Sequence, residues 1–159
     1  MPSKIQSIVL AGLIVGVVSP FSQLIPTVGG CIACILFLGT GVIATWHYTS
    51  THSLTIAPGT GAGIGALAGI AAALISAVVT LVFQSLDILP TVEDIIAQME
   101  ASGQLDDMPA EQRDTVTNMT RTMGGPAGYA IGAGMGLIFG ALGGLIGAAM
   151  FKKGEDDGF

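Results

Sequence analysis

Two cysteines and two histidines are the side chains of this sequence whose types and spacing could bind a metal or carry redox chemistry. Cys31 and Cys34 are separated by two residues, which places both thiols on one face of a helix, as in redox dithiols and metal sites. Their neighbours are apolar, and a thiolate is costly there without a positive partner. We therefore interpret both cysteines as small apolar residues, with redox or ligand binding as the alternative.

The histidines offer a second candidate site. Imidazole is a common metal ligand, so His47 could bind a metal or a pigment. However, no carboxylate lies near His47 or His52 in the sequence, and neither is expected deep in a membrane. We expect polar histidines at a membrane interface. The sequence thus predicts no catalytic residue, no cofactor and no metal site, and the protein is not expected to be an enzyme.

The composition shows which environment must hold these residues. The 159 residues are 51% hydrophobic and only 10% charged, and the mean hydropathy is +0.76, whereas about 25% charge is usual in soluble domains. No charged residue occurs between Lys4 and Asp87, or between Arg121 and Lys152. These runs exclude a water-soluble fold. A net charge of −6 with five basic residues argues against nucleic-acid binding.

Prolines, glycine pairs and polar stretches divide the chain into four apolar segments. Each is about as long as the roughly 20 residues that a helix needs to cross a bilayer. We predict transmembrane helices over residues 4–24, 28–48, 58–86 and 126–151. Pro20 kinks or ends the first helix, residues 49–53 connect the second to the third, and Pro58 opens the third. The first apolar segment lacks a signal-peptide cleavage pattern, so we expect it to remain as a span. Trp46, His47 and Tyr48 suit a headgroup interface.

The insert over residues 87–125 has the pattern of a helical hairpin. Thr91 and Asp94 fit a capping box, and apolar residues then recur at helical spacing up to Gly103. Pro109 suits the first turn of a second helix, with Met119 and Met123 on one face. The fold class is therefore an all-α integral membrane protein, a four-transmembrane-helix bundle with an extramembrane hairpin between helices 3 and 4, in a single domain over residues 1–159. The hairpin is either a docking surface or lid, or it packs only on itself and on the helix ends.

Few charges determine the orientation. Lys4, Lys152 and Lys153 lie on one side of the membrane if the number of spans is even, and positive residues favour the cytoplasmic side. We expect both termini in the cytoplasm, residues 84–125 on the outer side, and a location in a bacterial inner membrane. The acidity of the outer segment argues against adhesion to anionic lipid.

Glycine spacing is the strongest pattern in the chain. Glycines four residues apart share a helix face and allow another backbone to approach closely, which favours helix packing in lipid. The glycines that we expect at such contacts are Gly12, Gly16, Gly61, Gly65, Gly69, Gly128, Gly132, Gly136, Gly140 and Gly144. Their partner helix could belong to the same chain or to another subunit. Small residues on several sides of the segment 126–151 favour an additional intermolecular contact.

The stretch GLIVGVVSP from Gly12 to Pro20, the stretch GGCIAC from Gly29 to Cys34, and the glycine-rich third and fourth segments carry a resemblance. The chain resembles uncharacterised small glycine-rich bacterial membrane proteins with four transmembrane helices. The resemblance implies topology only, with no activity and no functional residue.

The absence of ionisable residues within the predicted spans disfavours an ion-coupled transporter. We expect a non-catalytic accessory or structural subunit of a larger membrane complex, such as a respiratory or photosynthetic one. Its partners would be the bilayer and other membrane subunits or copies of itself, contacted through the glycine faces and the hairpin. The alternative is a homo-oligomeric channel or small-solute facilitator. A membrane enzyme or redox carrier would depend on the cysteines and histidines alone.

Overall fold

The computed structural model describes residues 3–24, 29–106 and 108–151. Within these ranges the chain forms six α-helices, one 3₁₀ segment and no strand. The elements are α1 (Ile5–Val18), η1 (Ser19–Leu24), α2 (Gly29–His52), α3 (Pro58–Ser85), α4 (Val92–Ala101), α5 (Ala110–Gly124) and α6 (Pro126–Met150). In this part of the chain four helical segments are long and apolar enough to cross a membrane, namely α1 with the start of η1, α2, α3 and α6. The predicted fold class is confirmed, with α4 and α5 as the hairpin.

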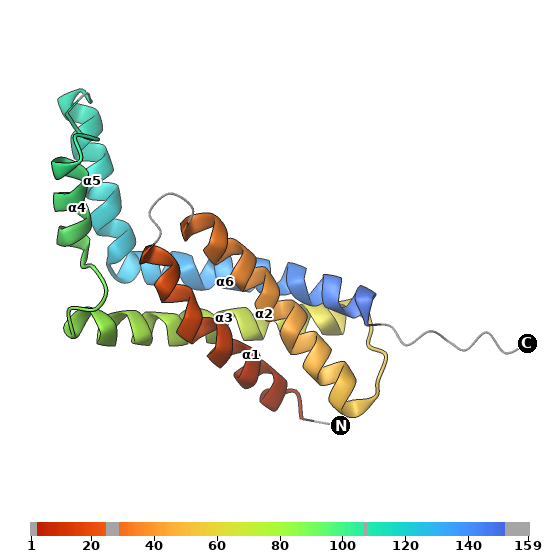
Figure 1. Ribbon diagram of the computed structural model, residues 1–159. Helices are drawn as coiled ribbons and strands as arrows, with labels where there is room; N and C mark the ends of the chain where they lie inside the picture. Colours follow the sequence, from red (N-terminus) through yellow and green to blue (C-terminus); the bar gives the residue numbers. More distant parts are fainter. Residues whose placement is uncertain (1–2, 25–28, 107, 152–159) are drawn as a thin grey trace, which may run out of the picture.

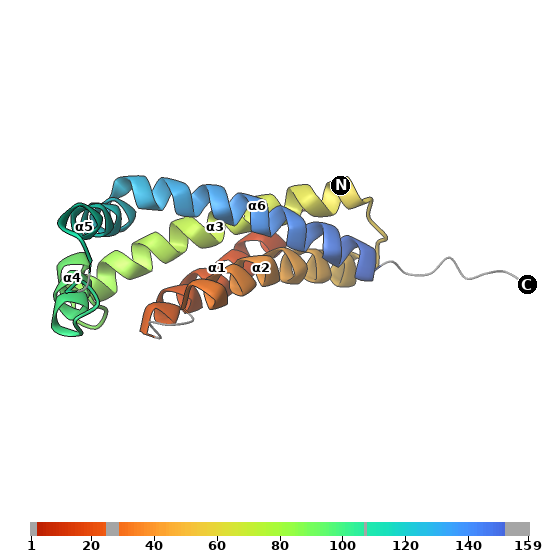
Figure 2. The ribbon, with the colours of Figure 1, turned by 90° about the horizontal axis from the view of Figure 1, so that it is seen from above.

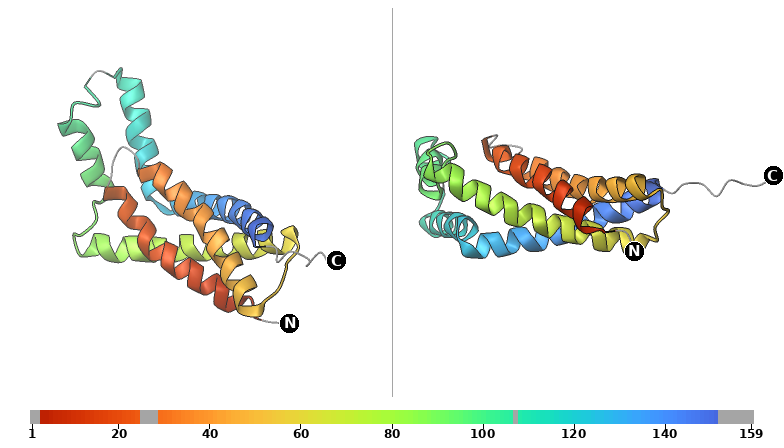
Figure 3. Two further views of the ribbon diagram at one scale, coloured as in Figure 1. Left: turned by 45° about the vertical axis from the view of Figure 1, so that its right-hand side comes forward. Right: turned by 90° about the horizontal axis from the view of Figure 1, so that it is seen from below.

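The four long helices form two layers (Figures 1 and 2). In one layer α3 and α6 run antiparallel side by side, and they share the most extensive contact in the molecule. In the other layer α1 packs mainly on α3 and α2 on α6. The start of α1 and the end of α6 lie at the same end of the bundle, whereas the hairpin lies at the opposite end with its axis across α3 and α6 (Figures 1 and 3).

Several predicted boundaries need correction. The first α-helix ends at Val18, and the chain continues as the 3₁₀ segment around the buried Pro20. The second helix extends to His52, so the predicted connection at residues 49–53 is wrong for residues 49–52. Thr49 lies within the helix, and its hydroxyl donates to the carbonyl of Thr45 one turn earlier, 3.0 Å away. Residue 28 lies outside the described residues.

Tyr48, one of the residues predicted to suit a headgroup interface, faces the inside of the bundle. Tyr48 is 4% exposed and belongs to the apolar core at the end of the bundle away from the hairpin. Its ring also packs edge-on against that of His52, with centroids 5.1 Å apart. Trp46, two residues earlier, is half exposed on the outer surface of the bundle. The helix turns Tyr48 inward and Trp46 outward because the two residues point about 200° apart.

The contact between α3 and α6 is made by backbone against backbone. Its glycines face each other in antiparallel pairs four residues apart: Gly61 with Gly144, Gly65 with Gly140, and Gly69 with Gly136. A Cβ added at Gly136 would lie 2.6 Å from the carbonyl oxygen of Gly69. Each of the other positions likewise faces a carbonyl oxygen of its opposite glycine. No side chain fits between the two helices here.

Two further glycine contacts complete the bundle. On a second face of α6, a Cβ at Gly147 would lie 2.9 Å from the Cβ of Thr45, and Gly143 faces the backbone of α2 at Leu38 and Gly41. Between α1 and α3, a Cβ at Gly12 would lie 2.9 Å from the Cβ of Ala71. A Cβ at Gly16 would lie 2.7 Å from that of Ile75. The close contacts therefore extend over all four long helices.

Gly132 and Gly128 do not take part in these contacts, although the sequence pattern included them. Around Gly132, no atom lies within 4 Å of the place that a Cβ would occupy, apart from its chain neighbours and its own helix backbone. A Cβ at Gly128 would meet the carbonyl group of Met123, so this glycine is required by the turn from α5 into α6. Beyond the pair of Gly69 and Gly136, α3 and α6 therefore no longer lie in backbone contact.

The first prediction tests this difference between glycines. Gly140→Ala should destabilise the bundle by about 1–3 kcal/mol, the usual cost of overpacking, because the added methyl group meets the backbone of α3. The matched Gly132→Ala should leave thermal unfolding in detergent unchanged or raise its midpoint, since alanine favours the helix. Equal losses in both variants would contradict this arrangement.

The second prediction concerns the buried hydroxyl of Thr45, which has no hydrogen-bond partner among the described residues. Thr45→Val keeps the shape and removes the unsatisfied group, so it should stabilise the bundle by about 1 kcal/mol. Thr40→Val is the control, because the Thr40 hydroxyl donates to the carbonyl of Leu36 at 3.0 Å. Thermal unfolding in detergent should show a gain for Thr45→Val and none for Thr40→Val. The interpretation fails if the order is reversed.

Candidate functional site

The cysteines lie near the start of α2. Cys31 is exposed, Cys34 is half-buried, and both are free thiols. No cluster of three or more His, Cys, Asp or Glu side chains in a metal-binding arrangement occurs within the described ranges. The structure therefore brings no further ligand to the predicted pair.

His47 connects two helices. Its Nδ1 and the hydroxyl of Ser7 on α1 are 2.9 Å apart and share a hydrogen bond. Ser7 is only 1% exposed, so this bond lies inside the bundle between α1 and α2. A hydrogen bond between transmembrane helices contributes roughly 0.6–2 kcal/mol. The geometry gives His47 a structural contact between α1 and α2.

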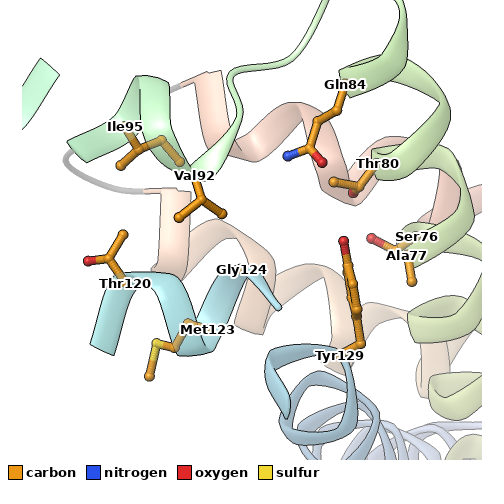
Figure 4. A pocket seen from close by; sticks show the side chains of 10 residues that line it. All are labelled: Ser76, Ala77, Thr80, Gln84, Val92, Ile95, Thr120, Met123, Gly124 and Tyr129. Atoms are coloured by element: carbon orange, nitrogen blue, oxygen red, sulfur yellow. The ribbon is translucent and has the colours of Figure 1, made fainter. Parts of the chain in front are cut away.

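A further candidate site is a pocket where the hairpin meets the bundle (Figure 4). Its volume is about 360 Å³, within the lower range of small-molecule sites. Helices α3, α4, α5 and α6 all contribute to its walls. The lining residues are Ser76, Ala77, Thr80, Gln84, Val92, Ile95, Thr120, Met123, Gly124 and Tyr129. Every one of them is uncharged.

The chain turns that hold α4 and α5 over α3 and α6 create this pocket. At the end of α3, Asp87 adopts a left-handed conformation (φ 55°) and the amide of Ile88 donates to the carbonyl of Phe83, 2.9 Å away. This Schellman-type ending turns the chain towards α4. On the other side, the backbone of α5 at Gly124 lies directly against the side chain of Val92. A larger residue at position 124 would push the two hairpin helices apart.

Three hydroxyls of the pocket keep free hydrogen-bonding capacity. Thr80 is 7% exposed, and within the described part of the chain its hydroxyl and that of Tyr129 form no hydrogen bond. The Ser76 oxygen accepts from Ser19 at 2.9 Å, so its own hydrogen is free to donate. In Figure 4 the Tyr129 hydroxyl points between α3 and the hairpin, towards Ser76 and Thr80.

Part of the hydrogen-bonding capacity of Gln84 is already used within the chain. Its side-chain amide nitrogen donates to the carbonyl of Pro90, 3.0 Å away, which fixes the connection into α4. Its side-chain oxygen has no partner among the described residues. The pocket thus combines three hydroxyl donors and one amide acceptor with apolar walls, mainly Ala77, Val92, Ile95 and Met123. Such a surface suits a molecule that is polar at one end and apolar elsewhere.

Sequence reasoning missed this site, although a signal was present. Ser76, Thr80 and Gln84 recur every four residues and form a polar stripe on an otherwise apolar helix. Ser76 and Thr80 are polar residues within a predicted span. In the described part of the chain neither hydroxyl bonds to its own helix backbone, and both line the pocket. The contribution of Tyr129 required the antiparallel pairing of α3 with α6.

The hairpin that closes the pocket has the predicted capping box. The Asp94 amide donates to the Thr91 hydroxyl at 3.3 Å, and the Asp94 carboxylate accepts from the Thr91 amide at 2.8 Å. The ion pairs Arg113–Glu100 (3.1 Å) and Arg121–Glu93 (3.9 Å) connect α5 to α4. All four charged side chains are exposed, so each pair contributes less than about 1 kcal/mol.

The cap gives the third prediction. Hydrogen bonds from the side chain and backbone of Thr91 lower the pKa of Asp94 below its ordinary value of 3.8. The stabilisation of α4 is therefore complete above that ordinary value and is lost as the pH falls through the lowered one. Thr91→Ala should raise the pKa of Asp94 relative to the wild type, as measured by NMR titration of the carboxyl carbon. An unchanged pKa of Asp94 would contradict the capping geometry.

Comparisons with known proteins place the chain within a family. None of the curated proteins and none of the solved structures matches it. One family model, described as "Protein of unknown function (DUF4199)", matches residues 6–153. This match covers all four membrane-spanning helices and the hairpin, and the chain therefore belongs to the DUF4199 family.

Proposed function

We propose that the protein is a non-catalytic integral membrane subunit that docks onto a partner protein through its hairpin. The observation that carries this proposal is the state of α5. This 15-residue helix buries none of its residues, and Met119 and Met123 are 55% and 52% exposed on it. An amphipathic helix that leaves most of its residues exposed is well suited to cover a surface on another protein.

The glycine faces are less available for docking than the sequence pattern implied. Gly136, Gly140 and Gly144 are in contact with α3, and Gly143 and Gly147 with α2. A partner helix cannot use positions that are already filled by backbone. This supports docking outside the membrane, and it argues against a pore lined by these glycines.

Charge on the hairpin indicates the chemistry of the partner. Glu93 and Glu100 pair with arginines, whereas Asp106, Glu111 and Asp114 form no ion pair within the described residues. The matching surface would carry Lys or Arg side chains around apolar groups that contact Met119. The flexible thioether of methionine adapts to such surfaces. The proposal retains cytoplasmic termini and an outer hairpin.

The fourth prediction is the test. The protein is extracted in mild detergent, its native mass is measured, and co-migrating proteins are identified. Discrete partners should copurify with the wild type and should be lost with Met119→Gln, which changes only the exposed face of α5. Met150→Gln is the matched control, because Met150 is 65% exposed at the far end of the bundle.

Three results would contradict the proposal. A lone monomer, or a partner that Met119→Gln and Met150→Gln retain equally, would show that α5 is not the docking element. A pure homo-oligomer that conducts ions or leaks solutes in liposomes would favour a channel.

A further inference from the structure

The pocket between α3, α6 and the hairpin is suited to a ligand of its own. We propose that it binds the uncharged, carbonyl-bearing head of a membrane amphiphile, whose carbonyl oxygens accept hydrogen bonds from Ser76, Thr80 and Tyr129. This site is separate from the exposed face of α5 at Met119, so it does not depend on the proposed docking function.

The free donors define the head of the ligand. Thr80 is more than nine-tenths buried, yet its hydroxyl has no partner within the described residues, and it lines the pocket. Because this hydroxyl faces the pocket, an acceptor that enters the pocket can take a hydrogen bond from it. The hydroxyls of Ser76 and Tyr129 are available to the same acceptor (Figure 4).

The lack of charge in the pocket lining further defines the chemical class of the ligand. None of the ten lining residues is ionisable at neutral pH, so a phosphate or an amine would lose its hydration without a counter-charge. A carbonyl group needs only hydrogen-bond donors. The apolar side chains of Val92, Ile95 and Met123 suit the carbon framework that adjoins it.

Depth in the bilayer favours a lipid-derived ligand. Thr80 lies five residues before the end of α3 at Ser85, or about 7.5 Å along the helix axis. Asp87 is the first charged residue after that end, which places the pocket just below the headgroup level. Ester carbonyls of glycerolipids lie near this depth. The ring carbonyls of a quinone offer the same chemistry.

Equilibrium binding to the purified full-length protein in detergent tests the proposal, with dioctanoylglycerol and a short-chain quinone as separate probes. At least one should bind saturably. Thr80→Val and Tyr129→Phe, which each remove one hydroxyl and keep the shape, should each weaken binding roughly threefold to tenfold. Tyr48→Phe is the matched control, since Tyr48 lies in the core at the other end of the bundle, and it should bind like the wild type.

The two probes also distinguish the two possible sources of the carbonyl group, an ester lipid and a quinone. Binding of the glycerolipid alone identifies an ester lipid, and binding of the quinone alone identifies a quinone. Dioctanoyl phosphatidic acid carries the same esters with an added phosphate and should bind much more weakly. Ala77→Leu, which fills the pocket, should abolish binding without unfolding the bundle.

Three results would overturn the proposal. The first is that neither probe binds saturably to the folded protein. The second is that Thr80→Val and Tyr129→Phe bind as well as Tyr48→Phe. The third is that phosphatidic acid binds as tightly as the neutral lipid, which would contradict the uncharged class.

Discussion

The approach of α3 and α6, backbone against backbone, is the constraint on which the rest of the molecule depends. Between helices in lipid there is little hydrophobic driving force, so their association relies on close van der Waals packing and on polar contacts. Three glycine pairs bring the two helices too close for any intervening side chain. Once α3 and α6 are joined, α1 packs on α3 and α2 on α6. The two-layer arrangement follows from that single contact.

The same contact explains where a pocket forms. The glycine pairing ends at Gly69 and Gly136, and the next position, Gly132, has open space beside it. Beyond this point α6 carries the large side chain of Tyr129, and α3 carries Ser76 and Thr80. The separated helix ends are then covered from outside by α4 and α5. The glycine spacing therefore explains both features. Where glycines pair, the two helices pack closely, and where the pairing ends, a pocket forms.

Much of this architecture was predictable because its causes are local. Apolar length determined the four long helices, and the Thr91–Asp94 cap with Gly103 determined the bounds of α4. The end of α2 was mispredicted because the polar threonines and histidine at residues 49–52 were interpreted as a connection, whereas they continue the helix. The pocket was missed because it depends on which face of α3 meets α6. A stripe such as Ser76 and Thr80 has no meaning until its partner helix is known.

The two halves of the protein are held together by different forces, and the pocket lies between them. The bundle depends mainly on close packing, supplemented by the hydrogen bonds between His47 and Ser7 and between Ser19 and Ser76. The hairpin depends on a charged cap and two exposed ion pairs, which acid or salt weakens. Conditions that loosen the hairpin therefore leave the bundle intact and remove one wall of the pocket. Conversely, any ligand that contacts both walls must stabilise the closed hairpin, because binding favours the state in which its contacts exist. The hairpin and the pocket are consequently coupled by geometry alone, whatever molecule occupies the site.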